Sequence, residues 1–202
     1  MEDNDTQAEM DWLLRLQKND EQALGALMKK YYADLYNYAI KFSPDEALVK
    51  DCIQEVFISL WQRRDSAVEI LSPKFYLLRA VKNKVLKSLH RNDRKVDSIR
   101  GEYDFQEEFS IERFIIEKQI SEEKAERLRK ALLGLSKRQN EVIHLKFYQH
   151  LDHAQIAELM NISRQSVYNL LHETIQKLRG LWHAEFVTRT ITIALLLPLL
   201  FS

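Results

Sequence analysis

Apolar residues recur at steps of three and four along most of the chain, which is the period of one face of an α-helix. Thr6 and Glu9 have the spacing of a capping box at the start of a first helix, and Ser43-Pro44 and Ser72-Pro73 mark the starts of a third and a fourth. The expected buried positions are Leu24, Leu27, Tyr31, Leu35, Tyr38 and Phe42 in the second helix, and Val49, Cys52, Ile53, Val56, Phe57 and Leu60 in the third. The pattern predicts a helical domain over residues 1–91.

The period lapses over residues 92–112, where acidic residues accumulate, so we expect an acidic linker there. It resumes in a second domain over residues 113–183, with a helix from Phe114 to Leu133 that stops at Gly134. Ser136 and Gln139 then open a shorter helix, which ends before a break at residues 149–151. Residues 184–202 form an apolar C-terminal tail.

The composition supports an all-α fold with two small helical domains. The 202 residues include only Gly 4 and Pro 3, too few turn formers for a sandwich or barrel and too scattered for a glycine-rich phosphate loop. The single cysteine, Cys52, excludes an internal disulfide. The acidic N-terminus does not resemble a signal peptide, and we expect a cytoplasmic protein.

The net charge of +0 conceals a strong segregation of charge along the chain. Residues 74–100 carry nine basic and two acidic residues, whereas residues 102–126 carry three basic and nine acidic residues. A second basic stretch follows over residues 127–183. A solvated helix face is one explanation, but a dense block of like charge repels itself and favours a polyanionic partner such as nucleic acid.

Residues 152–179 have the pattern of a helix-turn-helix. Apolar residues stand where two such helices meet, and Ala157 is small where their backbones approach most closely. Asn161 occupies the turn, where a positive φ is usual and asparagine is tolerated. A plain helical hairpin has similar spacing, but the outer face of the second helix favours DNA. The predicted DNA-binding residues there are Ser163, Arg164, Gln165, Ser166, Tyr168 and Asn169.

With both halves considered, the chain resembles the extracytoplasmic-function group of sigma factors in the sigma-70 family, from about Leu24 to Leu181. Residues 51–61 (DCIQEVFISLW) are similar to the signature of region 2, which in the family docks on the clamp helices of RNA polymerase. The helix-turn-helix and residues 135–142 resemble region 4, which reads the minus-35 element. The resemblance implies polymerase-binding roles for Asp51, Gln54, Glu55, Phe57 and Trp61.

Residues 75–83 resemble the segment that melts and holds the promoter's minus-10 element. Opening DNA requires a basic groove with aromatic residues on which unpaired bases can stack, and the fourth helix supplies both. The predicted DNA-binding residues of this helix are Lys74, Tyr76, Arg79, Asn83, Lys84, Lys87 and Arg91. The loop over residues 65–72 lacks the basic and glycine residues common in relatives, and Lys50 replaces an acidic residue of the family.

We therefore expect a non-enzymatic subunit whose partners are core RNA polymerase, promoter DNA at the minus-35 duplex and minus-10 strand, and an anti-sigma factor. No cofactor, metal or small-molecule substrate is expected. The alternatives are a helix-turn-helix regulator with an N-terminal sensing domain, and an enzyme. Against an enzyme, the His172-Glu173 pair lacks the second histidine that a zinc site of this type requires.

The apolar run over residues 191–201 is too short to cross a bilayer, so we expect it to pack within the protein or on a partner, or else to attach to a membrane surface.

Overall fold

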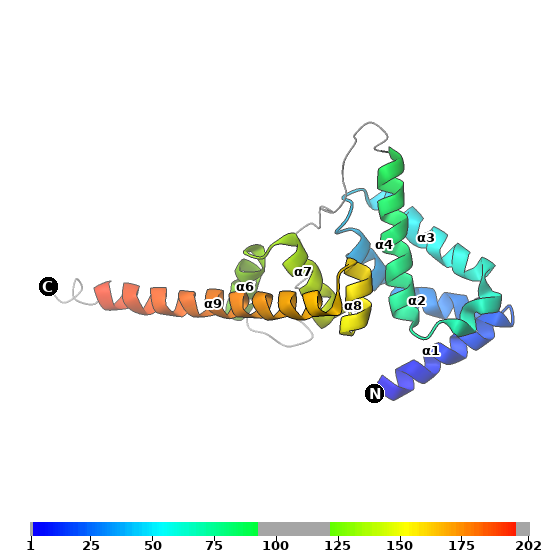
Figure 1. The fold of residues 1–202 in the computed structure, drawn as a ribbon, viewed down its shortest axis with the longest axis horizontal. Helices are drawn as coiled ribbons and strands as arrows, with labels where there is room; N and C mark the ends of the chain where they lie inside the picture. Colours follow the sequence, from blue (N-terminus) through cyan, green and yellow to red (C-terminus); the bar gives the residue numbers. More distant parts are fainter. Residues whose placement is uncertain (1, 93–121, 197–202) are drawn as a thin grey trace. The chain divides into compact units, whose positions relative to one another are not determined.

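The computed structural model describes residues 2–92 and 122–196 (Figure 1). The predicted acidic linker beyond Asn92, the first residues of the helix predicted from Phe114 and the last residues of the apolar tail lie outside this part of the chain. The described residues form helices and contain no strand, which confirms the all-α prediction. The chain divides into two compact units, unit 1 over Met1–Gln106 and unit 2 over Glu107–Ser202.

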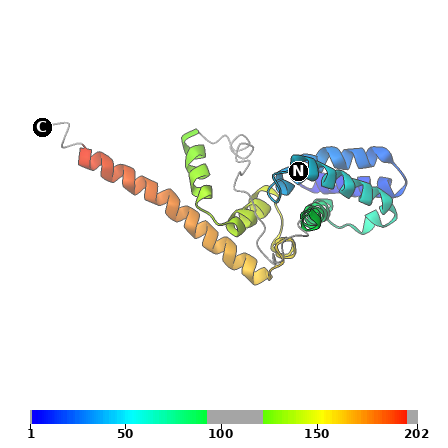
Figure 2. The ribbon, with the colours of Figure 1, turned by 90° about the horizontal axis from the view of Figure 1, so that it is seen from above.

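The described part of unit 1 contains four α-helices and one short 3-10 helix. They are α1 (Glu2–Gln17), α2 (Glu21–Ala39), α3 (Glu46–Gln62), η1 (Arg64–Glu69) and α4 (Pro73–Asn92). Seen from above, α1, α2 and α3 lie side by side, while α4 is viewed nearly end-on beside them (Figure 2). Both α2 and α3 pack against α4.

The core of unit 1 follows the predicted apolar stripes. All six predicted positions of α3 are buried, and Leu27, Tyr31, Leu35 and Tyr38 are buried along α2. Tyr38 meets Phe42 edge to face, with ring centroids 5.0 Å apart and planes at 87°. Each such buried side chain contributes about 1.5–3 kcal/mol relative to its exposure to water, so these stripes hold the helices together.

Two of the predicted helix starts in unit 1 are wrong. Helix α1 begins at Glu2, so Thr6 lies inside it and is not its cap. Helix α3 is capped by Asp45, whose side chain accepts a hydrogen bond from the Leu48 amide at 3.0 Å. Ser43 instead accepts from the Asp45 amide at 3.3 Å, one step before the cap. The predicted start of α4 is correct, because the helix begins at Pro73 and Ser72 precedes it.

In unit 2, the described residues form α6 (Glu122–Leu133), α7 (Lys137–Ile143), the π-helix η2 (His144–Tyr148), α8 (His153–Met160) and α9 (Arg164–Leu196). Capping boxes open α7, through Ser136 and Gln139, and α8, through Asp152 and Gln155. The first of these was predicted. Helices α6, α7 and α8 all pack against α9.

The helix-turn-helix is formed by α8, the turn over residues 161–163 and the first turns of α9. Asn161 adopts the left-handed conformation, with a φ of 52°, as its place in the turn predicted. Ile156 and Val167 are each 0 % exposed between the two helices, and Ala157 is 7 % exposed. The Ser163 hydroxyl accepts a hydrogen bond from the Ser166 amide at 3.0 Å and so caps α9.

Helix α9 continues beyond the predicted end of the second domain. It is described as far as Leu196, so the predicted apolar tail is helical over residues 184–196. Within the described ranges, none of the helices combines the length and the apolar character that a membrane span requires.

Candidate functional site

The first turns of α9 bring most of the predicted DNA-binding residues of unit 2 onto one exposed face. Arg164, Gln165, Tyr168 and Asn169 are all exposed, and Tyr168 is 58 % exposed despite its large ring. Gln165 donates a hydrogen bond from Nε2 to Asn169 Oδ1 at 2.9 Å. This bond orients both side chains, leaving a pair of amide groups aimed along the outer face of the helix.

Ser163 and Ser166 differ from the other predicted contacts because their hydroxyls already serve the turn. Their two oxygens lie 2.8 Å apart, and Ser163 also accepts the Ser166 amide. Both residues are exposed. Their local hydrogen bonds define where α9 starts and thus which residues its first turn presents.

His172 belongs to the same face, although its sequence context suggested only a candidate metal ligand. It is exposed and follows Tyr168 by four positions and Asn169 by three, which places all three on one side of the helix. The sequence signal that could have identified His172 is this spacing of three and four residues from Asn169 and Tyr168, which were predicted. Among the described side chains, no group of three or more His, Cys, Asp or Glu is arranged to hold a metal ion.

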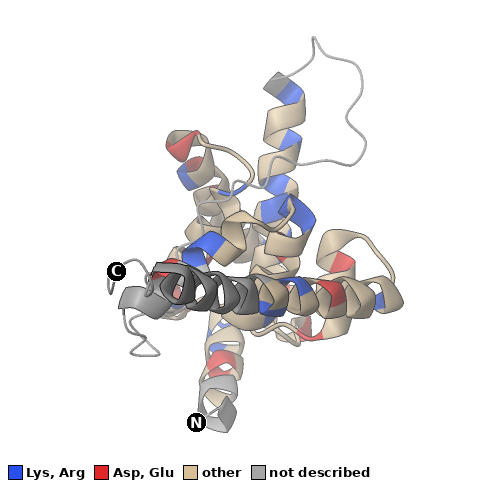
Figure 3. Cartoon of the chain, turned by 90° about the vertical axis from the view of Figure 1, so that its left-hand side faces the viewer, with Lys and Arg blue, Asp and Glu red and all other residues tan. Residues whose placement is uncertain are grey.

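Helix α4 carries the predicted minus-10 residues, and the structure divides them between faces. Tyr76, Arg79, Asn83 and Lys87 follow one another at steps of three and four and so share one side of the helix. Arg79, Asn83 and Lys87 are exposed, and Tyr76 is half-buried. Arg91 is exposed at the C-terminal end. Figure 3 shows basic residues recurring along α4. We call the four residues from Tyr76 to Lys87 the α4 stripe.

Lys74 and Lys84 lie on other sides of α4 and face acidic residues of neighbouring helices. The Lys74 Nζ is 3.4 Å from Asp34 of α2, and Lys84 forms an ion pair with Glu55 of α3. Ion pairing reduces the charge that either lysine offers to DNA. The structure therefore does not bring these two residues together with the α4 stripe.

The predicted polymerase-binding residues of α3 form an exposed row, with one exception. Asp51, Gln54 and Glu55 are exposed on the side of α3 opposite its buried stripe. Phe57 is only 2 % exposed and belongs to the core, so its side chain supports the helix and offers no contact surface. Its place in the region 2 signature predicted a polymerase contact, but the spacing of the apolar residues in this helix had also predicted that Phe57 is buried.

Ile58 completes this row and is not among the residues predicted from the sequence. It is 53 % exposed, and it follows Asp51, Gln54 and Glu55 at the spacing of one helix face. Trp61 lies at the end of the row, half-buried, with the Arg64 guanidinium 4.9 Å from its ring centroid. We call Asp51, Gln54, Glu55 and Ile58 the α3 face.

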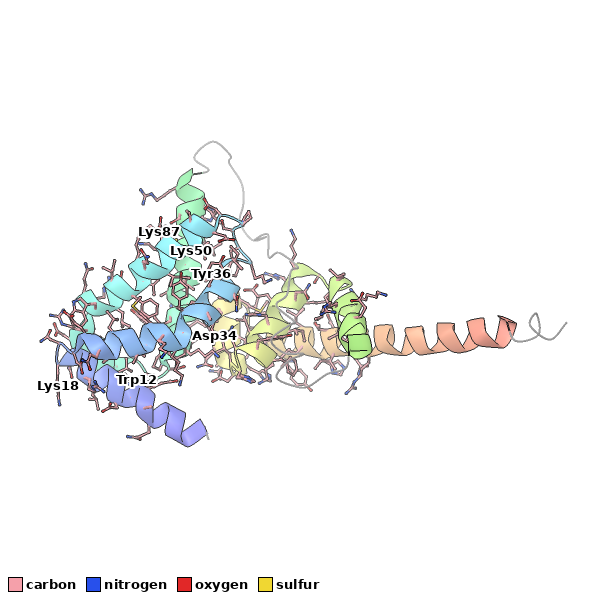
Figure 4. All side chains as sticks on the ribbon, turned by 180° about the vertical axis from the view of Figure 1, so that it is seen from behind. Trp12, Lys18, Asp34, Tyr36, Lys50 and Lys87 are labelled. Carbon is pink, nitrogen blue, oxygen red and sulfur yellow. The ribbon has the colours of Figure 1, made fainter. Side chains whose placement is uncertain are left out.

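Lys50, which departs from the family's acidic residue, is neutralised locally. Its Nζ lies 2.9 Å from Glu46 Oε2 and 5.8 Å from the ring centroid of Tyr36 (Figure 4). The hydrogen bond and charge of Lys50 lower the pKa of Glu46, and Glu46 in turn raises the pKa of Lys50. Partial burial and the nearby Glu46 raise the pKa of Tyr36. The charge of Lys50 is thus compensated beside Asp51.

A hollow lies between η1 and the start of α4, with a volume of about 410 Å³. Tyr76 forms part of its wall, which places the pocket next to the α4 stripe. Apolar, hydroxyl and charged groups all contribute to the lining. The lining residues are Leu60, Arg63, Ser66, Ala67, Glu69, Ile70, Leu71, Ser72 and Tyr76. We call this hollow the η1 pocket.

Comparison with known proteins identifies both units. The family model described as "Sigma-70 region 2" matches residues 27–95, and the one described as "Sigma-70, region 4" matches residues 125–178. Region 2 followed by region 4 is the composition of a two-domain sigma factor. The chain therefore belongs to the sigma-70 family, as its resemblance to the extracytoplasmic-function group predicted, and it functions as an RNA polymerase sigma factor.

The fold is also similar to that of a solved structure, CnrH in complex with the cytosolic domain of CnrY. The TM-score is 0.52 at 19 % sequence identity, and the match covers 88 % of this chain and 98 % of CnrH. No curated protein matches the sequence.

Proposed function

We propose that the sigma factor binds core RNA polymerase through the α3 face, holds the minus-10 strand with the α4 stripe and reads the minus-35 duplex with α9. The α3 face supports the first role because an exposed isoleucine among polar residues is typical of the centre of a protein interface. Ile58 would supply apolar contact, while Asp51, Gln54 and the carboxylate of Glu55, which also pairs with Lys84, would accept or donate hydrogen bonds around it.

Holoenzyme assembly tests this surface. The Gln54→Ala, Glu55→Ala double variant and the Ile58→Asp variant should both weaken assembly with core polymerase, since each removes a part of the α3 face. The matched control is Lys29→Ala, an exposed residue of α2. Assembly of both α3 variants at the parent's affinity would mean that polymerase binds elsewhere.

The position of Tyr76 is the observation that carries the minus-10 role. This aromatic residue stands at the head of the α4 stripe and also lines the η1 pocket. A base displaced from the duplex could stack on the ring and enter the pocket while the phosphates follow Arg79 and Lys87. The mixed polar and apolar lining of the pocket is suited to distinguishing one base from another.

Tyr76 variants can separate stacking from packing. Stacking of a base on an aromatic ring contributes about 1–3 kcal/mol, so Tyr76→Ala should weaken binding of minus-10 single strands by about 5- to 150-fold. Tyr76→Phe keeps the ring and should bind nearly as well as the parent. If holoenzymes carrying Tyr76→Ala open promoters normally in permanganate footprints, Tyr76 has no role in strand capture.

The proposed roles are all non-catalytic, and polymerase supplies the chemistry of transcription. A partner of this kind implies action in the cytoplasm. CnrH was solved with the cytosolic domain of CnrY, and by this likeness we also propose an anti-sigma factor as a partner. Copurification with a protein whose removal increases holoenzyme assembly would support that partner.

A further inference from the structure

The η1 helix forms one wall of the η1 pocket, and it is short. It is a 3-10 helix of 6 residues, and helices of this kind are held less firmly by internal hydrogen bonds than α-helices are. The Ser66 amide donates to the Arg63 carbonyl and the Ile70 amide to the Ala67 carbonyl, each at 3.1 Å. The position of this wall must therefore depend on the elements packed against it.

The corner between α1 and α2, residues 17–20, supplies two side-chain contacts to η1. Gln17 donates from Nε2 to the backbone carbonyl of Asp65 at 2.9 Å, and Arg64 donates from Nε to Asn19 Oδ1. These contacts join residues 48 and 45 positions apart in the chain. Behind them, α1 packs against η1, with Leu13, Leu16 and Ala67 all buried.

Arg64 is also held from the side of α3. Its Nη1 donates to the Trp61 carbonyl at 3.0 Å, and its guanidinium lies over the Trp61 ring. The first residue of η1 is therefore fixed between the corner and the end of α3. A displacement of either contact would shift η1 relative to Tyr76 on α4.

The corner itself is well defined by local bonds. Asn19 has a φ of 64°, the left-handed conformation, and its amide donates to the Leu16 carbonyl at 3.0 Å. Asp20 caps α2 and forms an ion pair with Arg15 at 2.8 Å, so the chain is fixed on both sides of Asn19. The corner thus presents its side chains from a constrained backbone.

We propose that the corner between α1 and α2 positions the wall of the η1 pocket and thereby sets base selectivity at the minus-10 element. Gln17 and Asn19 act as positioning residues, since neither lines the pocket. The inference rests on the proposed function of the η1 pocket. Its physical basis is that a site distinguishes ligands only when the surrounding residues hold its lining groups in a fixed geometry.

The Gln17→Ala, Asn19→Gly double variant removes both contacts with little backbone strain, because glycine accepts a positive φ. Asn19→Asp keeps an oxygen acceptor for Arg64 and serves as the conservative variant. The matched control is Lys18→Ala, an exposed residue of the same corner (Figure 4). Each protein is assembled with core polymerase and assayed by run-off transcription on promoters that carry every base at each minus-10 position.

The double variant should assemble with polymerase as the parent does. Its ratio of run-off transcription between the best and the worst minus-10 base should fall about fivefold, which is the effect of losing one hydrogen bond between the pocket and the base. Asn19→Asp and Lys18→Ala should keep the parent's ratio. In hydrogen exchange, the amides of Ser66 and Ile70 should exchange faster in the double variant alone. This second measurement reports how firmly η1 is held, without reference to promoter DNA.

The two possible failures are distinguishable. If the parent shows no base preference at any minus-10 position, the proposed function of the pocket is wrong and the inference falls with it. If the parent discriminates and the double variant discriminates equally well, only the inference is overturned. Faster exchange in η1 with unchanged selectivity also overturns it, because the wall would then move without consequence for base choice.

Discussion

Helices α4 and α9 both present a row of polar side chains, but the two rows differ in charge. The α4 stripe alternates cations with a neutral amide and begins at a half-buried tyrosine. The exposed face of α9 begins with Arg164 and continues with uncharged side chains, two of which are linked by a hydrogen bond. The difference fits the two proposed roles. Charge and stacking on α4 would hold an unpaired strand, whereas oriented amides on α9 would read base edges.

The largest effect is expected from the face of α9. Arg164→Ala and Gln165→Ala should each reduce the preference for the correct minus-35 sequence by about 1–3 kcal/mol, because each removes a group able to bond base edges. Affinities for correct and scrambled duplexes give the measurement, and Gln176→Ala, exposed farther along α9, is the control. Equal losses on both duplexes would make these residues phosphate contacts, and α9 would then resemble α4.

A change of comparable size is expected from the packing beneath that face. Ala157→Leu adds volume where α8 meets α9 and should lower the free energy of unfolding by about 1–3 kcal/mol. Thermal unfolding measures it, with His153→Leu at an exposed position of α8 as control. Unchanged stability would show that the two helices do not require a small residue at their contact.

The cations of the α4 stripe, unlike Tyr76, should respond to salt rather than to sequence. Lys87→Ala should weaken binding of every minus-10 single strand alike and reduce the slope of log affinity against log salt by about 0.7. Lys74→Ala is the matched control, since Lys74 pairs with Asp34 on another side of the helix. A loss confined to one sequence would contradict the proposed contrast between α4 and α9.

The smallest expected effect is a dependence of stability on acidic pH. It distinguishes the units, because a helix of unit 1 has a charged cap and α9 of unit 2 has an uncharged one. Arg15 lowers the pKa of the Asp20 carboxyl through a hydrogen bond, whereas the cap of α9 is the uncharged Ser163. Asp20 therefore stabilises unit 1 above its ordinary pKa of about 4, and this contribution disappears as the pH falls through its lower value in the folded protein. Asp20→Asn keeps a capping oxygen.

The difference in melting temperature between the parent and Asp20→Asn should thus shrink on acidification. Ser163→Asn should show no such trend. If the Asp20→Asn difference stays constant from neutral pH to pH 3, the ion pair with Arg15 does not contribute to folding.

The sequence predicted what depends on local periodicity. The buried stripe of α3, the break before α8 and the left-handed Asn161 all follow from neighbouring residues, and all are present. The start of α3 was misplaced because Ser43 and Asp45 both have capping side chains, and only the folded backbone selects between them.

Predictions that depended on distant parts of the chain were less complete. Lys74 and Lys84 were grouped with the other DNA-binding residues of α4 on the basis of local sequence. Local sequence could not reveal their ion-pair partners, Asp34 and Glu55, because these lie on other helices. Ile58 was missed because an apolar residue in a helix is usually a core residue, although its spacing from Asp51, Gln54 and Glu55 already placed it on the exposed side. The contacts of the α1–α2 corner with η1 likewise leave no trace in local spacing.

Asn161 has a practical consequence for protein engineering. Its backbone conformation strongly favours glycine, asparagine or aspartate, so the turn tolerates few substitutions. The side chains at positions 165, 168 and 169 face outward and carry no core packing. A library randomised at these three positions, with Asn161 kept fixed, would sample new promoter specificities on an unchanged scaffold.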